Sequence, residues 1–101
     1  MSRLQKGDIV KHFKYNALSQ EEKNKNKYLY IIRDIATHTE TEEKLVIYQA
    51  LYKDSCFGQD FGVYARPYDM FMGKVDKEKY PNVKQEYRFE KVDGYATQEI
   101  L

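Results

Sequence analysis

Apolar and β-branched residues are concentrated in the middle of this 101-residue chain. Two runs rich in Tyr, Ile and Leu, at 28–37 and 45–52, are separated by a polar segment at 38–44. A third run, 61–66, ends at Pro67, whose backbone has no N–H to donate to a strand ladder. Runs of this composition, interrupted by short polar connections, predict neighbouring antiparallel strands.

Three further elements are predicted on either side of these runs. Residues 9–13 follow a Gly-Asp turn and alternate in polarity without a clean apolar face, which predicts a strand near a sheet edge. Residues 85–92 alternate regularly and predict a last strand that pairs with the first. Residues 68–71, directly after the proline, have the composition of one helical turn.

The central runs carry apolar residues on both faces of the expected strands, and only a closed or covered sheet can bury both faces. The charged pair Arg33-Asp34 interrupts the first run, and either a central strand in a closed small barrel or a strand with a β-bulge near this pair would explain the pattern. Five strands, a long first connection and a helical turn after the fourth strand predict a mainly β fold, a small five-stranded antiparallel SH3-like barrel. An open sheet carrying one helix is the alternative.

The chain length allows one domain over residues 1–101, with a core at about 8–92. Residues 14–27 form a polar loop between the first two strands. Within it, the sequence Ser-Gln-Glu-Glu at 19–22 matches a helix capping box and predicts at most a turn or two of helix. Residues 93–101 are expected to be a frayed tail.

The composition predicts a small core beneath a heavily charged surface. Hydrophobic residues make up 42% of the chain and charged residues 33%, with ten Tyr, five Phe and no Trp. A Tyr ring packs in a core while its hydroxyl stays near water, so packing accounts for most of the tyrosines. The net charge of +1 lacks the strong basic bias of a typical nucleic-acid-binding domain. The basic excess lies in residues 1–33, which carry eight Lys/Arg against three Asp/Glu, whereas residues 34–101 carry nine against thirteen.

Several classes of site and location are disfavoured by the sequence. The single cysteine, Cys56, excludes an internal disulfide and a zinc site built on thiolates. No Walker loop, Gly-x-Ser-x-Gly or Gly-x-Gly-x-x-Gly sequence occurs, and we expect no cofactor. No secretory signal is recognisable, and no stretch approaches the roughly eighteen apolar residues of a membrane span. We therefore expect a cytoplasmic protein with no membrane contact.

The acidic residues of the polar turn give a weak chemical signal. Glu40, Glu42 and Glu43 are expected to form a solvated tip, because tuning a carboxylate for acid–base catalysis requires burial. His38 and Glu40, joined by His12, could supply three metal ligands. Their spacing matches no metal-binding signature, so we expect no metal site.

Arg66 is the most distinctive candidate for binding. Pro67 fixes the chain just after it, and Tyr64 lies on the same side of the predicted strand two residues earlier. A guanidinium held beside an aromatic ring can bind a carboxylate or phosphate through two parallel hydrogen bonds. The alternative is an internal ion pair with Asp69 or with a carboxylate of the turn at 39–43, and the pattern favours this structural role.

Several spaced motifs occur in one order along residues 8–92. They are His12-Phe-Lys14, Tyr30-x-x-x-x-Ile-Ala-x-His-Thr-Glu-Thr41, Leu45-Val-x-Tyr-x-Ala-Leu-Tyr52, Val63-Tyr-Ala-Arg-Pro-Tyr-Asp-Met-Phe71 and Tyr87-Arg-Phe-Glu-Lys91. With these motifs the chain resembles a small, mostly bacterial family, the domain-of-unknown-function family numbered 1653. The resemblance implies a compact, often stand-alone β domain and no established activity. The family has Gly and a shorter loop after His-Phe-Lys, so residues 17–27 resemble an insertion.

The polar and aromatic motif residues of that family fall, by position, on His12, His38, Glu40, Tyr48, Tyr52, Arg66 and Asp69. We predict a non-enzymatic binding module that uses Tyr and Arg on one face of the barrel. The predicted ligand-binding residues are Arg66, Tyr48, Tyr52, Tyr64, His12 and His38. The expected partner is a protein or a small anionic ligand. One alternative is a single-stranded RNA or DNA contact through stacked Tyr rings, and another is an enzyme or metabolite pocket around Arg66.

Overall fold

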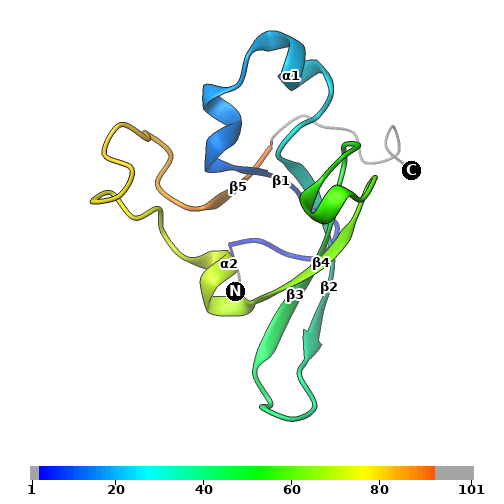
Figure 1. Cartoon of the computed structure of the whole chain (residues 1–101). Helices are drawn as coiled ribbons and strands as arrows, with labels where there is room; N and C mark the ends of the chain where they lie inside the picture. The colour runs from blue at the N-terminus through cyan, green and yellow to red at the C-terminus, as the bar shows by residue number, and fades with distance from the viewer. Residues whose placement is uncertain (1–2, 93–101) are drawn as a thin grey trace.

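A computed structural model of the protein describes residues 3–92. Five strands form one antiparallel sheet in the order β4-β3-β2-β1-β5 (Figure 1). The strands are β1 (Ile9–His12), β2 (Leu29–Thr37), β3 (Lys44–Ala50), β4 (Val63–Pro67) and β5 (Phe89–Lys91). The helical segments are η1 (Phe13–Ala17), α1 (Gln20–Asn24), η2 (Cys56–Gly58) and α2 (Tyr68–Met72), of which η1 and η2 are 3₁₀ turns.

The main features predicted for the fold are confirmed. It is mainly β and antiparallel, α2 follows the fourth strand, and β5 pairs with β1 with His12 opposite Phe89. The register between β2 and β3 shifts by one residue between Ile32 and Asp34, so of the two explanations considered for this strand the bulge is the one observed. The last strand is shorter than the predicted stretch at 85–92, because only its final residues pair with β1.

Closure of the sheet into an SH3-like barrel is not confirmed. In residues 3–92 the edge strands β4 and β5 have no ladder between them, so the hydrogen bonding is that of an open sheet. The sheet is nevertheless strongly curved. The ring of Phe89 in β5 lies 5.8 Å from that of Tyr48 in β3 and 4.1 Å from that of Phe71 in α2, measured between ring centroids. The guanidinium carbon of Arg66 in β4 lies 5.7 Å from the same Phe89 ring, so the curvature brings the two edges of the sheet toward each other.

The two-sided apolar pattern of the central strands is buried on both faces of the sheet. The larger core cluster contains Leu4, Val10, Tyr30, Ile32, Val46, Tyr48, Ala50, Tyr52, Phe71 and Phe89. On β2, Tyr30 and Ile32 belong to this cluster, whereas Leu29 and Ile31 belong to a second, smaller one. Tyr15 of η1 packs against the smaller cluster. Burial therefore does not require a closed barrel, because the segment after β1 covers the second face.

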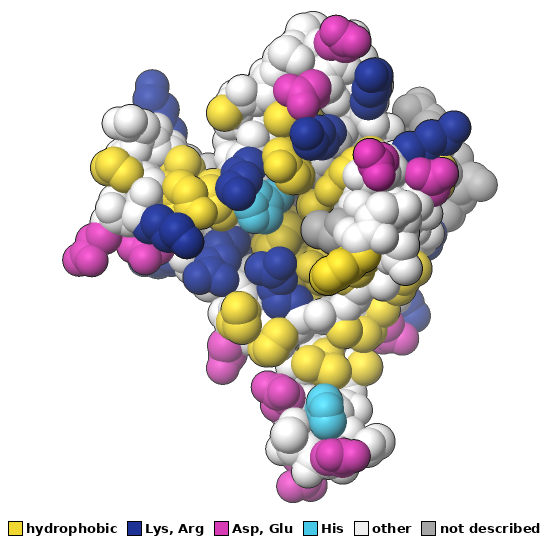
Figure 2. All heavy atoms as spheres, in the orientation of Figure 1, with side chains coloured by type: hydrophobic (Ala, Val, Ile, Leu, Met, Phe, Trp, Pro, Cys, Tyr) yellow, Lys and Arg dark blue, Asp and Glu magenta, His cyan; other side chains and the backbone are white. Residues whose placement is uncertain are grey.

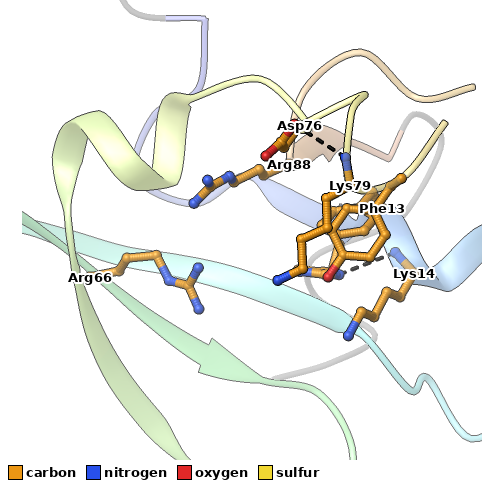
Figure 3. A pocket seen from close by; sticks show the side chains of 8 residues that line it. Phe13, Lys14, Arg66, Asp76, Lys79 and Arg88 are labelled. Atoms are coloured by element: carbon orange, nitrogen blue, oxygen red, sulfur yellow. Dashed lines mark hydrogen bonds between the residues drawn. The ribbon is translucent and has the colours of Figure 1, made fainter. Parts of the chain in front are cut away.

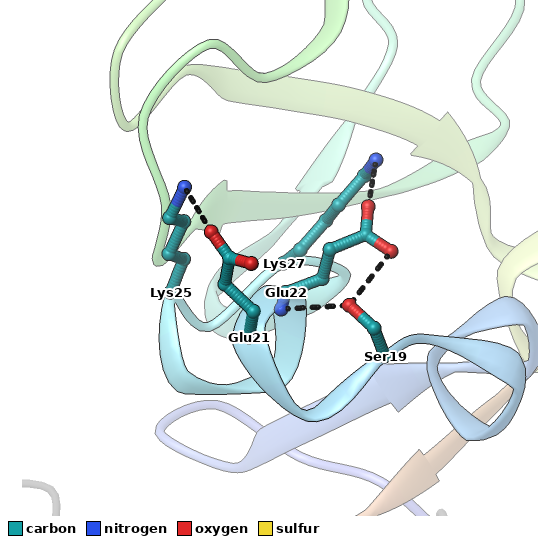
Figure 4. Close-up of polar contacts among 5 residues, drawn as sticks. All are labelled: Ser19, Glu21, Glu22, Lys25 and Lys27. Carbon is teal, nitrogen blue, oxygen red and sulfur yellow. Dashed lines mark hydrogen bonds and ion pairs between the residues drawn. The ribbon is translucent and has the colours of Figure 1, made fainter.

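The segment at 14–27, predicted as a polar loop, contains most of η1 and the whole of α1. The N-cap of the predicted capping box is confirmed: Ser19 Oγ accepts a hydrogen bond from the amide of Glu22 at 3.2 Å and donates to the Glu22 carboxylate at 3.4 Å (Figure 4). Glu22 also forms an ion pair with Lys27 at 3.0 Å. The predicted frayed tail at 93–101 lies outside the described residues. Within residues 3–92, every helix falls short of the length and apolar character needed to span a bilayer.

Candidate functional site

A polar pocket of about 300 Å³ lies between the two edges of the curved sheet. Four cationic side chains line it: Lys14 of η1, Arg66 of β4, Lys79 from the connection after α2, and Arg88 just before β5. Figure 3 shows the side chains of Arg66 and Arg88 extending into this space from different segments. Figure 2 shows Lys and Arg side chains gathered around a hollow in the middle of this face of the molecule.

The backbone holds both arginines in place. Arg66 is paired with Val46 of β3, and its guanidinium carbon lies 5.7 Å from the ring centroid of Phe89. The amide of Arg88 donates to the carbonyl of Gly73, and the carbonyl of Arg88 accepts from the amide of Phe13, both at 3.0 Å. Each guanidinium therefore extends from a segment that is hydrogen-bonded to its neighbours.

Within the part of the chain that the structure describes, neither guanidinium group donates a hydrogen bond to a protein acceptor. Within residues 3–92, the side chains of Arg66 and Arg88 form no hydrogen bond and no ion pair. The internal ion pair of Arg66 with Asp69 or with a carboxylate of 39–43, which the sequence pattern favoured, is not formed. Both arginines are half-buried, so each has lost part of its hydration.

The other two arginines of the chain, Arg3 and Arg33, both donate hydrogen bonds to protein acceptors. Arg3 donates to the carbonyl of Phe89 at 2.8 Å and to that of Met72 at 3.3 Å. The Nε of Arg33 donates to Gln49 Oε1 at 2.9 Å. Among the described residues, guanidinium groups without a protein acceptor therefore occur only at the pocket.

Asp76 is the acidic side chain that lines the pocket, and it is engaged by the backbone. Its Oδ1 accepts hydrogen bonds from the amides of Glu78 at 3.0 Å and Lys79 at 3.3 Å. The amide of Tyr80 donates to the carbonyl of Asp76 at 2.8 Å. Asp76 thus shapes the turn that presents Lys79 and Tyr80 to the pocket, and four cationic groups face one carboxylate.

His12 lines the same pocket in its neutral form. Its Nδ1 accepts a hydrogen bond from the amide of Lys14 at 3.1 Å, so this nitrogen carries no proton and Nε2–H is the donor. Burial, followed by the positive charges of Lys14, Arg66 and Arg88, lowers the pKa of His12 from 6.5 to about 4. At neutral pH the ring adds a hydrogen-bond donor to the pocket and no charge.

Phe13 and Tyr80 form an aromatic wall of the pocket. Their ring centroids are 4.9 Å apart, with Phe13 buried and Tyr80 half-buried. The Nζ of Lys79 lies 5.5 Å from the ring centroid of Tyr80. The wall therefore places an aromatic surface directly beside the cationic groups.

A buried glutamine supports the pocket from behind. Gln85 Nε2 donates to the carbonyls of Tyr87 at 2.9 Å and Lys11 at 3.3 Å, and its Oε1 accepts from Asn16 Nδ2 at 2.9 Å. These bonds join β1, η1 and the segment that leads into β5. Gln85 therefore holds together the segments that carry Lys14 and Arg88.

Of the six predicted ligand-binding residues, the structure brings only Arg66 and His12 together in this pocket. The rings of Tyr48 and Tyr52 are in the core, with 6% and 5% of their surface exposed. The hydroxyl of Tyr52 lies 2.8 Å from that of Tyr30, and the hydroxyl of the half-buried Tyr64 lies 2.6 Å from Ser55 Oγ. These tyrosines serve packing and internal hydrogen bonding.

His38 lies in the turn between β2 and β3. Its Nδ1 accepts hydrogen bonds from the amides of Glu40 at 3.2 Å and Thr41 at 3.3 Å, so its role there is to shape the turn. Among residues 3–92, no three His, Cys, Asp or Glu side chains are placed so that they could hold a metal ion together. His12, His38 and Glu40 therefore do not form the metal site considered from the sequence.

Three cationic residues and the aromatic wall were missed from the sequence. Lys79 and Tyr80 lie in a charged connection without hydrophobic periodicity, and Arg88 lies within the stretch at 85–92 that the sequence predicts as an ordinary strand. The adjacent pair Lys79-Tyr80 was the available signal. This pair indicates a binding site only in the folded structure, where it lines the same pocket as Arg66.

The fold and the pocket together define a class: a small antiparallel β-sheet domain with a cationic pocket between its sheet edges. The family model described as "Protein of unknown function (DUF1653)" matches residues 8–91, and the chain belongs to this family. The predicted resemblance is thereby confirmed. All residues that line the pocket lie within the matched range. No curated protein and no solved structure matches the chain.

Proposed function

We propose that this protein is a binding domain whose ligand is an anion, a phosphate or a carboxylate, held by Arg66 and Arg88. One observation carries the proposal: two half-buried guanidinium groups line a single pocket, and within residues 3–92 neither has an acceptor. A half-buried guanidinium that lacks a hydrogen-bond acceptor has lost hydration, and the contact of Arg66 with the Phe89 ring supplies no acceptor for its N–H groups. An anion in the pocket supplies the missing acceptor.

The residue types suit this role. A guanidinium presents a planar fork of donors that matches the two oxygens of a carboxylate or phosphate, whereas Lys14 and Lys79 act as point charges at the rim. A hydrogen bond to a charged group contributes about 1.5–3 kcal/mol. Two such forks therefore provide useful affinity for a small ligand even after the entropic cost of binding.

We also infer that the fold is an open variant of the SH3-like arrangement. The supporting features are the pairing of β5 with β1, the long connection between β1 and β2, and a short helix between β4 and β5. In this arrangement the pocket occupies the gap that a closed barrel would fill with a ladder between its edges.

An NMR titration with inorganic phosphate and with acetate tests the proposed function. We expect saturable shifts of the amides around Arg66, His12 and Arg88, and at least a tenfold weaker affinity in Arg66→Ala and in Arg88→Ala. Arg66→Lys keeps the charge but loses the fork, so its affinity should be intermediate. Arg33→Ala is the matched control, because it removes the same charge away from the pocket.

Two results would overturn the proposal. One is the absence of saturable binding for both anions. The other is an equal loss of affinity in Arg33→Ala and Arg66→Ala, which would assign the binding to overall charge. Urea unfolding of each variant separates lost binding from lost folding. We expect Arg66→Ala to lose about 1 kcal/mol or less, because no described side chain loses a hydrogen-bond partner and the variant removes the contact with the Phe89 ring.

A further inference from the structure

We propose that the anion is the phosphate of a nucleoside phosphate, with its phosphate on Arg66 and Arg88 and its planar base stacked on Tyr80. This inference rests on the proposed function and narrows the ligand of the same pocket. Three features of the pocket support it: the amount of charge, the aromatic wall and the available space.

The charge of the pocket exceeds what one carboxylate needs. Four cationic side chains face Asp76, whose Oδ1 already accepts hydrogen bonds from the amides of Glu78 and Lys79. A monocarboxylate neutralises one of these cations. A phosphate monoester brings close to two negative charges and three oxygens, so it can meet both guanidinium forks at once.

The aromatic wall is placed for stacking. Tyr80 is half-buried, lines the pocket, and makes its aromatic contact among the described residues with Phe13. Its backbone is held by a hydrogen bond to the carbonyl of Asp76 at 2.8 Å and by one from the amide of Val83 at 3.2 Å. An aromatic ring beside cationic side chains is the combination that recognises a base together with its phosphate.

The available space sets the size of the ligand. A volume of about 300 Å³ is at the lower limit for small-molecule pockets, which suits one nucleotide. The same chemistry could come from a free mononucleotide or from one nucleotide of a single strand. The free nucleotide fits better, because the cations converge on one pocket and the net charge of the chain is only +1. A long polyanion would require an extended basic surface.

Calorimetric titration of the full chain with four compounds tests the inference: inorganic phosphate, ribose 5-phosphate, adenosine 5′-monophosphate and uridine 5′-monophosphate. We expect at least one of the mononucleotides to bind about tenfold more tightly than ribose 5-phosphate, because stacking on an aromatic side chain favours the base. Tyr80→Leu should abolish this ratio while ribose 5-phosphate affinity stays within twofold, and Tyr80→Phe should preserve it.

Tyr87→Leu is the matched control. Tyr87 is half-buried like Tyr80, but its ring lies under Arg3, 3.9 Å from the guanidinium carbon, outside the pocket. This variant should retain the tenfold ratio. Tyr80→Phe keeps the aromatic ring and provides a second test if Tyr80→Leu folds poorly. If a folded Tyr80→Phe lost the tenfold preference for the mononucleotide over ribose 5-phosphate, stacking on the ring would be contradicted.

The outcomes separate this inference from the proposed function. If ribose 5-phosphate and both mononucleotides bind equally and depend on Arg66, the stacking inference is overturned and anion binding stands. If no phosphate compound binds, both fail. If an eight-residue oligouridylate binds more than tenfold tighter than uridine 5′-monophosphate, with strong salt dependence, the free nucleotide is overturned in favour of a single strand.

Discussion

The cationic pocket and the tip of the β2–β3 hairpin each combine a histidine with a cluster of like charges. In both regions the histidine Nδ1 accepts hydrogen bonds from backbone amides. His12 accepts from the amide of Lys14, and His38 accepts from the amides of Glu40 and Thr41. The settings differ in burial. The arginines of the pocket are half-buried and extend from held segments, whereas the tip carboxylates are exposed on a turn. A charge cluster becomes a candidate site where the fold encloses it, and remains a solvated surface where it does not.

The largest expected contrast between the two regions concerns charge reversal. Arg88→Glu should weaken phosphate binding more than a hundredfold, because it removes one fork and places a carboxylate beside the ligand. Lys44→Glu makes the same change in net charge at the exposed base of the hairpin and should change the affinity less than twofold. Calorimetric titration measures both. An equal loss in both variants would remove the distinction between pocket and tip.

The second contrast is in the pH dependence of folding. Because the pKa of folded His12 is lowered to about 4, the unfolded chain takes up a proton near pH 6.5 while the folded chain does not. Stability is therefore full above pH 6.5 and falls as the pH is lowered, until the loss is complete near pH 4. A shift of this size corresponds to roughly 3 kcal/mol. Urea unfolding between pH 7 and pH 4 measures it.

Paired variants assign this pH dependence to one histidine. His12→Gln should remove most of the loss of stability between pH 6.5 and pH 4, since the amide oxygen can replace Nδ1 as the acceptor for Lys14. His38→Gln should leave the loss in place, because it originates at the pocket. A pH profile that changes equally in both variants would argue against the burial of His12 as its cause.

A smaller contrast is expected for the hydrogen bonds that shape each region. Gln85→Leu should cost about 1–3 kcal/mol, because Asn16 and the carbonyls of Lys11 and Tyr87 lose a partner inside the protein. Thr41→Ala removes one exposed acceptor at the hairpin tip and should cost less than about 0.5 kcal/mol. Thermal unfolding compares the two. Equal effects would show that Gln85 does not support the pocket.

The smallest effect should come from α1, which lies away from both regions. Its five residues are all outside the core, and Ser19 caps it (Figure 4). Ser19→Ala should therefore cost about 1 kcal/mol or less, with unchanged phosphate affinity. A loss above about 2 kcal/mol, measured by urea unfolding, would show that α1 contributes to the packing of the domain.

Local patterns in the sequence predicted much of the sheet. The charged pair Arg33-Asp34 marks the bulge because it interrupts an apolar run, and Pro67 marks the end of β4 because it lacks an N–H. The apolar residues on both faces of the central strands did not show what covers the second face of the sheet. Burial by a closed barrel and burial by η1 on the second face give the same pattern, so the sequence could not decide between them.

The candidate site was only partly predictable. Arg66 and His12 could be singled out because a proline and a motif surround them, but Tyr48 and Tyr52 have the same composition whether they face a ligand or the core. Arg88 reaches the pocket through the curvature of the sheet and the bonds of Gln85, and Lys79 through the turn that Asp76 shapes. Contacts of this kind join segments far apart in the sequence, and no local periodicity encodes them.

The central claim is that Arg66 and Arg88 hold an anion together, and ligand-induced stabilisation tests it most directly. Thermal unfolding is measured in phosphate and in chloride at equal ionic strength, for the wild type and for the Arg66→Ala/Arg88→Ala double variant. At phosphate concentrations of 100 times the Kd, the wild type should gain about 2.7 kcal/mol, and the double variant only the small general effect of phosphate. The same gain in both proteins would contradict the claim.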